Sequence, residues 1–354
     1  VSMSIEKEAF RGCTNLTAVN FDKVTRMGEA AFAETGLKSI KLGEGLTSIP
    51  KKAFLSCRAL TDVTLSKTVE SIGESAFSNC NALTKITLNE GLKTIGQEAL
   101  YRTHISTLHL PSTFKDMGGS YMGDVFEVAG QNPADTAMKT ITVSDDNPLY
   151  SSHDGILYNK KATKVVFCPR GVTSAKVLDG VTEIGDSAFF MCFDLESVKL
   201  PDTLKVVGKG AFQYDEALTE CELPKGLETV KDSAFFGAEN WTGVDRIPST
   251  VKTIGAYGFA ECKGSKLTIP EGITKIEEFS FWGYEEGLEE INLPSTLKII
   301  GNSAFSWAKD VKKLVIPEGV TSIGAEAFAR LDSLESLTLP STLQEIGSKA
   351  FMGK

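Results

Sequence analysis

The chain of 354 residues contains no apolar run that approaches the roughly 20 residues needed to span a bilayer as a helix. It also lacks an excess of positive charge, because 37 Lys and Arg stand against 46 Asp and Glu, giving a net charge of −9. Binding to nucleic acid or to anionic lipid draws its affinity from clustered positive charge. We therefore expect no nucleic acid partner and no membrane span in this stretch of sequence.

Motifs that carry catalysis or bind cofactors are also missing. No G-x-S-x-G occurs, the GGSYMG at 118–123 has no G-K-[ST] after it, and the SDDNP at 144–148 lacks the spacing of a calcium loop. The three histidines, His104, His109 and His153, have no Cys or carboxylate at a metal-like spacing. We therefore expect a protein that is not an enzyme and has no cofactor and no metal site.

What the sequence does contain is a repeat. The dipeptide Ala-Phe, or a close variant, recurs every 22 to 24 residues outside the stretch 100–189, and we call its second residue the anchor. The anchors are Phe10, Phe32, Phe54, Phe77, Leu100, Phe126, Phe189, Phe212, Phe235, Phe259, Phe281, Phe305, Phe328 and Phe351. Between anchors the chain reads L-x-x-I-x-L-P-x-x-L-x-x-I-G-x-x-A-F-x-x-C. Such a period is typical of solenoids, in which each repeat buries its apolar face against its neighbours.

Each part of the repeat has a physical interpretation. The alternation in L-x-x-I-x-L indicates a short strand with one buried face, and the Pro that follows ends it. Gly follows the second Ile in 10 of 14 repeats, but Pro50 and Lys231 also occur there. Since Pro requires a negative φ, we expect this Gly to permit close packing rather than a left-handed backbone.

The pattern predicts a β-rich, right-handed leucine-rich repeat solenoid that forms a single domain over 1–354. We expect one curved parallel sheet of about 14 short strands and a convex side of turns, 3-10 pieces and very short strands. The sequence begins without an initiator Met and partway through a repeat. We interpret it as a fragment without a signal peptide, and we expect ends without polar caps.

The repeat becomes irregular between Leu100 and Phe189. Extra residues predict irregular insertions at 117–137. A second insertion at 144–171 carries GILYN and TKVVFCP on either side of KKA, which predicts an antiparallel β-hairpin between residues 155 and 169. Insertions in solenoids often form the binding face. The alternative is a tolerated elaboration of the surface.

The repeat resembles the BspA-like leucine-rich repeat (bacterial surface leucine-rich repeat) family. The resemblance covers essentially the whole chain and is most specific in IPEGVTSIGAEAF at 316–328 and in 147–169, which is similar to a hairpin insertion that recurs in that family. Members are typically secreted or displayed on bacterial surfaces, and some are adhesins. The resemblance implies an extracellular or cell-surface binding protein whose partner is another protein, such as host matrix or a cell-surface molecule. We expect a monomer.

Cysteine positions follow the repeat. Five of the seven lie three residues after an anchor, where other repeats carry Thr35, Ala129 or Ala238. These five are Cys13, Cys57, Cys80, Cys192 and Cys262. A position that accepts Cys, Thr and Ala is a small packed site, so we expect buried free thiols. A disulfide or a metal site is the alternative.

The candidate partner-binding residues are aromatic, because the residues expected on the concave face are small or charged and interface hot spots favour Trp and Tyr. They lie close to the anchors in the C-terminal half: Phe190, Tyr214, Phe236, Trp241, Tyr257, Trp282, Tyr284 and Trp307. They either wedge between neighbouring turns or form an exposed stripe along one edge. We predict a non-catalytic protein-binding protein. The alternatives are a glycan-binding surface protein and a structural spacer without a ligand of its own.

Overall fold

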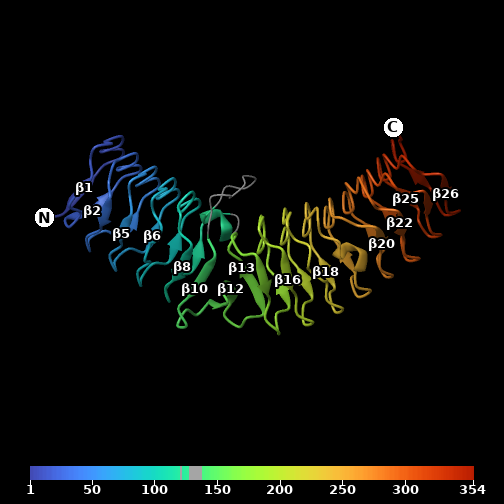
Figure 1. Cartoon of the computed structure of the whole chain (residues 1–354), viewed down its shortest axis with the longest axis horizontal. Coiled ribbons are helices and arrows are strands. Elements are labelled where there is room, and N and C mark those ends of the chain that lie inside the picture. The colour runs from blue at the N-terminus through green and yellow to red at the C-terminus, as the bar shows by residue number, and fades with distance from the viewer. Residues whose placement is uncertain (120–121, 127–137) are drawn as a thin grey trace. The chain divides into compact units, whose positions relative to one another are not determined.

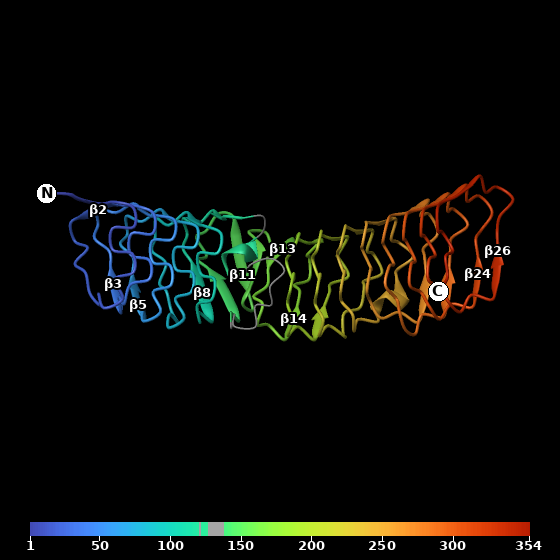
Figure 2. The same ribbon diagram turned by 90° about the horizontal axis from the view of Figure 1, so that it is seen from above.

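The structure is a computed structural model that describes residues 1–119, 122–126 and 138–354. Most of the insertion predicted at 117–137 therefore lies outside the described residues. The chain forms two compact units, the first unit (1–161 and 166–172) and the second unit (162–165 and 173–354). Within each unit, successive coils of the repeat lie side by side (Figure 1, Figure 2). That the units act as the single domain expected from the sequence stays a prediction.

Strands formed by the L-x-x-I-x-L pattern make up what we call the strand row. In the first unit they are β3 (Ser39–Lys41), β5 (Asp62–Thr64), β8 (Thr107–Leu110) and β10 (Thr140–Val143). In the second unit they are β14 (Ser174–Lys176), β16 (Ser197–Lys199), β20 (Lys266–Thr268), β22 (Glu290–Asn292), β24 (Lys313–Val315) and β26 (Ser336–Thr338). Most of these strands bury the middle apolar residue and expose its neighbours, as the alternation predicts.

A second set of strands, the short row, precedes the I-G position. In the first unit it contains β1 (Met3–Ile5), β2 (Val24–Met27), β4 (Ser48–Ile49), β6 (Ser71–Ile72), β7 (Thr94–Ile95) and β9 (Asp116–Met117). In the second unit it contains β15 (Glu183–Ile184), β17 (Val206–Val207), β18 (Thr229–Val230), β19 (Thr253–Ile254), β21 (Lys275–Ile276), β23 (Ile299–Ile300), β25 (Ser322–Ile323) and β27 (Glu345–Ile346). Every pairing within this row is parallel and links successive coils.

The parallel solenoid with few helices is confirmed, but its pairing is not concentrated in one sheet of about 14 strands. The strand row is divided into pairs such as β3–β5, β14–β16 and β24–β26, with single bridges at Thr64–Thr87 and Ser197–Glu220. The short row pairs over longer runs, for example β4–β6–β7–β9 and β21–β23–β25–β27. In one coil of the second unit the 3-10 helix η2 (Gly243–Arg246) stands where a strand of the strand row would lie.

The inserted hairpin is present, but its extent differs from the prediction. β11 (Tyr150–His153) pairs antiparallel with β12 (Ile156–Asn159), and Asp154 and Gly155 form the turn between them. β12 and β13 (Lys164–Phe167) correspond to the two arms predicted from GILYN and TKVVF. The strand β11 was missed because its sequence, YSSH, has no apolar alternation. A second 3-10 helix, η1 (Met122–Val125), lies in the irregular region of the first unit.

The anchors form the core of the turns. In the second unit the rings of Phe189, Phe212 and Phe235 stack with centroids 4.9 Å apart, and the stack continues to Phe351. In the first unit a similar stack runs from Phe10 to Phe77. Most anchors are fully buried, and burial of this many rings is the main source of cohesion between coils.

The glycine of the I-G pair serves close packing, as predicted. At Gly73 an added Cβ would lie 2.7 Å from the backbone nitrogen of Lys51 in the preceding coil, and at Gly347 it would lie 2.4 Å from the nitrogen of Ala325. Neither glycine has a positive φ. The preference for Gly at this position therefore comes from the close approach of the preceding coil, not from backbone handedness.

Candidate functional site

The turns around the anchors contain two left-handed residues in nearly every repeat. One lies two residues before the anchor and the other two residues after it, with φ between 50° and 75° where the residue is not Gly. Around Phe259 these residues are Tyr257 (φ 58°) and Glu261 (φ 53°). A left-handed backbone is costly for any residue except Gly, so an interaction common to all repeats has to compensate.

Hydrogen bonds between coils provide that compensation. The backbone N–H groups of Tyr257, Phe259 and Glu261 donate to carbonyls of the next coil over 3.2, 2.9 and 2.7 Å. The same three bonds recur at most anchors in both units. Alternating left-handed and right-handed residues turn every second N–H toward the next coil. The fold therefore fixes the backbone at these positions and leaves their side chains at the edge of the turns.

In the second unit this edge carries a continuous row of aromatic rings, which we call the aromatic strip. Tyr257 and Phe279 stack with centroids 4.7 Å apart and an interplanar angle of 2°, and Phe236 stacks on Tyr257 at 5.0 Å. The row extends to Tyr214, 5.6 Å from Phe236, and to Trp282, 6.3 Å from Phe279. Phe190 closes it at 6.1 Å from Tyr214. All members except Phe190 are half-buried.

Phe279 was not among the residues predicted from the sequence. It precedes an anchor by two residues, as Tyr257 does, and both are left-handed. The sequence FSF at 279–281 contains a second Phe close to the anchor Phe281, and only the anchor was considered in the prediction. Position relative to the anchor was the signal that could have identified it.

Two predicted residues are not available to a partner. Trp241 is fully buried, stacks on Phe235 at 4.1 Å and donates its indole N–H to the Cys221 carbonyl over 2.8 Å. This hydrogen bond satisfies a carbonyl of the preceding coil, next to the place where η2 stands instead of a strand. Tyr284 is 2% exposed and donates its hydroxyl to the Phe259 carbonyl over 2.5 Å. Phe190 is 9% exposed, so it packs against the strip but offers little surface to a partner.

Trp307, the last predicted residue, is half-buried and is already occupied by cations of the chain itself. The guanidinium of Arg330 lies 4.4 Å from the ring centroid, and the ammonium of Lys309 lies 5.0 Å from it. Lys309 also makes an ion pair with Glu285 at 3.6 Å. This arrangement holds an ammonium between an aromatic ring and a carboxylate.

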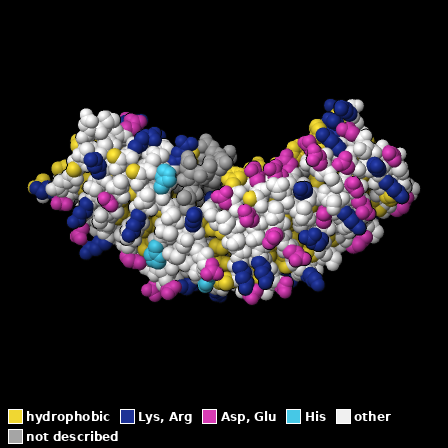
Figure 3. Space-filling view, in the orientation of Figure 1, with side chains coloured by type: hydrophobic (Ala, Val, Ile, Leu, Met, Phe, Trp, Pro, Cys, Tyr) yellow, Lys and Arg dark blue, Asp and Glu magenta, His cyan; other side chains and the backbone are white. Residues whose placement is uncertain are grey.

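Carboxylates run beside the aromatic strip. Burial raises the pKa of Glu261, and the neighbouring Glu239 and Glu285 raise it further. Burial and then Glu239 raise the pKa of Glu216. In the space-filling view, acidic and apolar side chains lie together on the upper edge of the second unit (Figure 3). The edge therefore combines apolar rings with repelling negative charges.

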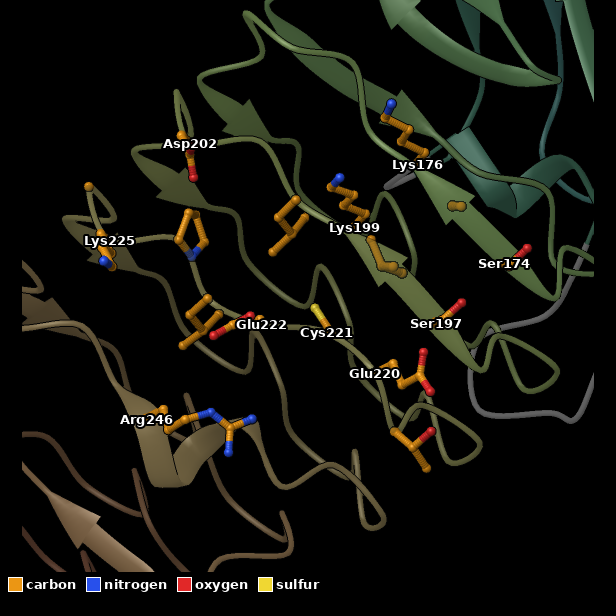
Figure 4. Close-up of a pocket in the computed structure, with 17 residues that line it drawn as sticks. Ser174, Lys176, Ser197, Lys199, Asp202, Glu220, Cys221, Glu222, Lys225 and Arg246 are labelled. Atoms are coloured by element: carbon orange, nitrogen blue, oxygen red, sulfur yellow. The ribbon is translucent and has the colours of Figure 1, made fainter.

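A second candidate lies on the strand row of the second unit. A hollow of about 1180 Å³ borders β14, β16 and η2, and none of the 17 residues that line it is aromatic (Figure 4). Its charged side chains are of both signs: Lys176 and Lys199 are register partners, Glu220 and Glu222 follow, and Arg246 comes from η2. It is an open surface with both polar and apolar residues, and it offers no aromatic side chain to a partner.

The cysteines are free thiols, and most are buried. Cys57, Cys80 and Cys262 donate to carbonyls at 3.1, 3.2 and 3.3 Å, those of Phe32, Phe54 and Phe235. Burial raises the pKa of the Cys57 thiol. Cys13 is exposed, contrary to the prediction, because within the described residues only the following coil packs against its turn.

Within residues 1–119, 122–126 and 138–354, no group of three or more His, Cys, Asp or Glu side chains is arranged to hold a metal ion. Across the same residues, no helix combines the length and the apolar character needed to cross a membrane.

The chain is similar to solved leucine-rich repeat structures. The pneumococcal vaccine antigen PcpA aligns with a TM-score of 0.61 and 24% identity over 95% of this chain and 84% of that one. A leucine-rich repeat protein from Eubacterium ventriosum aligns with a TM-score of 0.61 and 22% identity over 85% of this chain and 83% of that one. No curated protein matches the chain.

A family model described as the BspA type leucine rich repeat region matches residues 3–123, 160–246 and 245–354 in six copies. These matches include most strands of both rows, most anchors and the aromatic strip. The chain therefore belongs to the BspA-type leucine-rich repeat family.

Proposed function

We propose that this protein is a non-catalytic binding protein, secreted or displayed on a bacterial surface, which recognises another protein through the aromatic strip. The observation that carries the proposal is the half-exposed row of stacked rings on one edge of the second unit. Large aromatic side chains in neighbouring, rigid positions contribute most strongly to protein interfaces. The surface location rests on family membership.

The hollow on the strand row supports this role less well. It offers charged side chains on a wide and open surface, where ion pairs are exposed to solvent and contribute little. The aromatic strip instead presents apolar area that gains free energy when a partner covers it.

A pull-down against host matrix proteins and mucin, followed by biolayer interferometry, tests the proposal. The informative variant is the double substitution Tyr257→Ser and Phe279→Ser. Ser occupies the same left-handed position at Ser187, Ser233 and Ser303, so the turn tolerates it. We expect a loss of affinity of at least about tenfold for the captured protein.

The matched control is Lys52→Ser, which changes the corresponding position of the first unit. Affinity that survives the double substitution would place the binding surface elsewhere. Capture of mucin alone, with signals on a glycan array, would favour the glycan-binding alternative. No capture at all, under conditions in which the protein is folded, would favour the spacer.

A further inference from the structure

We propose that the aromatic strip takes a basic partner, namely a Lys- and Arg-rich segment of a polypeptide. This inference rests on the proposed function and specifies the chemistry of the partner. It is carried by the charges that surround the rings, by the orientation of the rings and by the way in which the chain itself uses the same chemistry at Trp307.

The charge around the strip is strongly one-sided. From three residues before to four residues after each anchor between Phe189 and Phe281, only Lys209 and Lys263 are basic. The exposed or half-buried acidic residues in the same windows are Asp186, Glu216, Asp232, Glu239, Glu261, Glu278 and Glu285. A partner that covers the rings must therefore meet a negative rim, which favours a positive partner and disfavours a negative one.

Three carboxylates of this rim are not neutralised by an ion pair within the described residues. Glu216, Glu239 and Glu261 make no ion pair in the described part of the chain, although Glu239 lies close enough to raise the pKa of both neighbours. Glu261 is joined to the strip directly, because its N–H donates to the Trp282 carbonyl over 2.7 Å. Lys263 makes no ion pair with these carboxylates in the described residues. An incoming cation would relieve their mutual repulsion.

The rings offer two kinds of surface to such a cation. Tyr214 is inclined by 53° and 54° to its neighbours, and Trp282 is inclined by 68° to Phe279, so no ring of the strip covers their faces in a parallel stack. Ring faces that no other ring covers can attract ammonium and guanidinium groups where a partner reaches them. The parallel stack of Tyr257 on Phe279 instead presents ring edges, which suit the aliphatic stems of Lys and Arg.

The coil after the strip shows this recognition within the chain. There Lys309 lies over Trp307 and pairs with Glu285 of the preceding coil, and Arg330 of the following coil covers Trp307 and pairs with Asp332 at 3.0 Å. Along the rest of the strip, the described residues place no such cation over Tyr214 or Trp282, and none pairs with Glu216, Glu239 or Glu261. We infer that a partner supplies them. A neutral glycan would also use the rings and would donate hydroxyls to the carboxylates, but it would not neutralise their charge.

The inference can be tested with defined probes on the full chain. Fluorescence polarisation would compare a short peptide in which Arg and Lys alternate with Gly and Ser against the same peptide with Glu in place of each basic residue. We expect saturable binding of the basic peptide alone, weakened as salt is raised. The substitutions Tyr257→Ser with Phe279→Ser, and separately Glu239→Gln with Glu261→Gln, should each lower its affinity about tenfold.

Matched controls separate the site from net charge. Glu44→Gln with Glu70→Gln removes the same charge from exposed ion pairs with Lys67 and Lys93 in the first unit, and should leave the affinity unchanged. Equal binding of both peptides, or equal losses in the control, would overturn the inference. A protein partner that requires Tyr257 and Phe279 but tolerates Glu239→Gln with Glu261→Gln would retain the proposed function and still reject the basic partner.

Discussion

Two residues before their anchors, the coils of the first unit carry Glu8, Ala30, Lys52, Ser75 and Glu98. The corresponding positions of the second unit include Tyr257 and Phe279. The φ angles are the same in both units, between 55° and 60° for these residues. The bonds between coils are also the same. The backbone therefore does not select the side chain at this position, and what the two units display can differ while their scaffold stays alike.

The charges on the two edges differ in the same way. Around the anchors from Phe10 to Leu100, five acidic and six basic side chains lie within the same windows that hold seven acidic and two basic side chains at the strip. Salt bridges such as Lys51–Glu74 at 3.6 Å and Arg11–Glu34 at 3.5 Å neutralise part of the first edge. The stacked anchors and the backbone bonds are therefore common to the two units, whereas the side chains at the edge differ. Each of these two statements can be tested.

Removal of an anchor should have the largest effect, and it should be equal in the two units. Phe54 and Phe212 are both fully buried between stacked neighbours. We expect Phe54→Ala and Phe212→Ala to lower the free energy of unfolding by about 3–5 kcal/mol each, measured by urea denaturation. The half-buried Phe236 is the control, and Phe236→Ala should cost clearly less. Unequal losses at the two anchors would contradict a shared core.

Substitution of a packing glycine should have the next largest effect, again in both units. An added Cβ would lie 2.7 Å from Lys51 N at Gly73 and 2.7 Å from the Ile276 carbonyl oxygen at Gly301. We expect Gly73→Ala and Gly301→Ala to cost about 1–3 kcal/mol by the same measurement. Gly353 has no atom within 4 Å of such a Cβ, and Gly353→Ala should be neutral. Unchanged stability of Gly73→Ala or Gly301→Ala would mean that the coils do not need to approach closely at these glycines.

Exchange of side chains at the left-handed positions should affect stability only moderately. Tyr257→Ser removes one half-buried ring, and we expect a loss of about 1 kcal/mol. The reverse change, Lys52→Tyr in the first unit, should leave the protein folded, with a change in thermal unfolding no larger than that of Tyr257→Ser. Circular dichroism and calorimetry would measure both. Unfolding of the Lys52→Tyr protein would show that the backbone at this position restricts which side chain it can carry.

The smallest effect concerns the titration of Glu261. Because its folded pKa is raised, chiefly by burial and then by Glu239 and Glu285, the folded state binds protons more readily than the unfolded state. This carboxylate therefore destabilises the fold at neutral pH, and the penalty disappears as pH falls through the raised pKa. We expect Glu261→Gln to stabilise the protein by about 0.3 kcal/mol at neutral pH and to have no effect in acid.

Substitution of Glu318 should change the stability at neutral pH in the opposite direction. Hydrogen bonds from the Ser341 backbone and hydroxyl lower the pKa of Glu318, so its contribution is favourable at neutral pH and is lost as pH falls through the lowered value. Glu318→Gln should therefore reduce stability at neutral pH. The same sign for both variants in urea titrations would mean that these local environments do not control the pH dependence.

Much of the fold follows from the sequence because the solenoid depends on periodic apolar residues. The anchors, the inward middle residues of the strands and the packing glycines are each visible as a repeated letter. The left-handed positions are not, since they carry Glu, Lys, Ser, Tyr and Phe, none of which signals a positive φ. The break at η2 was also hidden, so Trp241 could not be recognised as the group that fills it.

The candidate site was predicted only in part for the same reason. The sequence placed aromatic residues near the anchors, but which of them are accessible depends on offsets of one or two residues. Trp282, one residue after its anchor, is half-buried, whereas Tyr284, three residues after it, is buried. The role of the strip as a binding surface remains a prediction.

Backbone bonds that hold the turns irrespective of side chain also affect how such a protein can evolve. A substitution at a left-handed position leaves the hydrogen bonds between coils intact, so new specificities are reachable by single mutations that do not pass through unstable intermediates. Duplication of one coil adds two further outward positions at the same spacing. Selection can thus lengthen or rewrite the displayed surface while the inherited core remains unchanged.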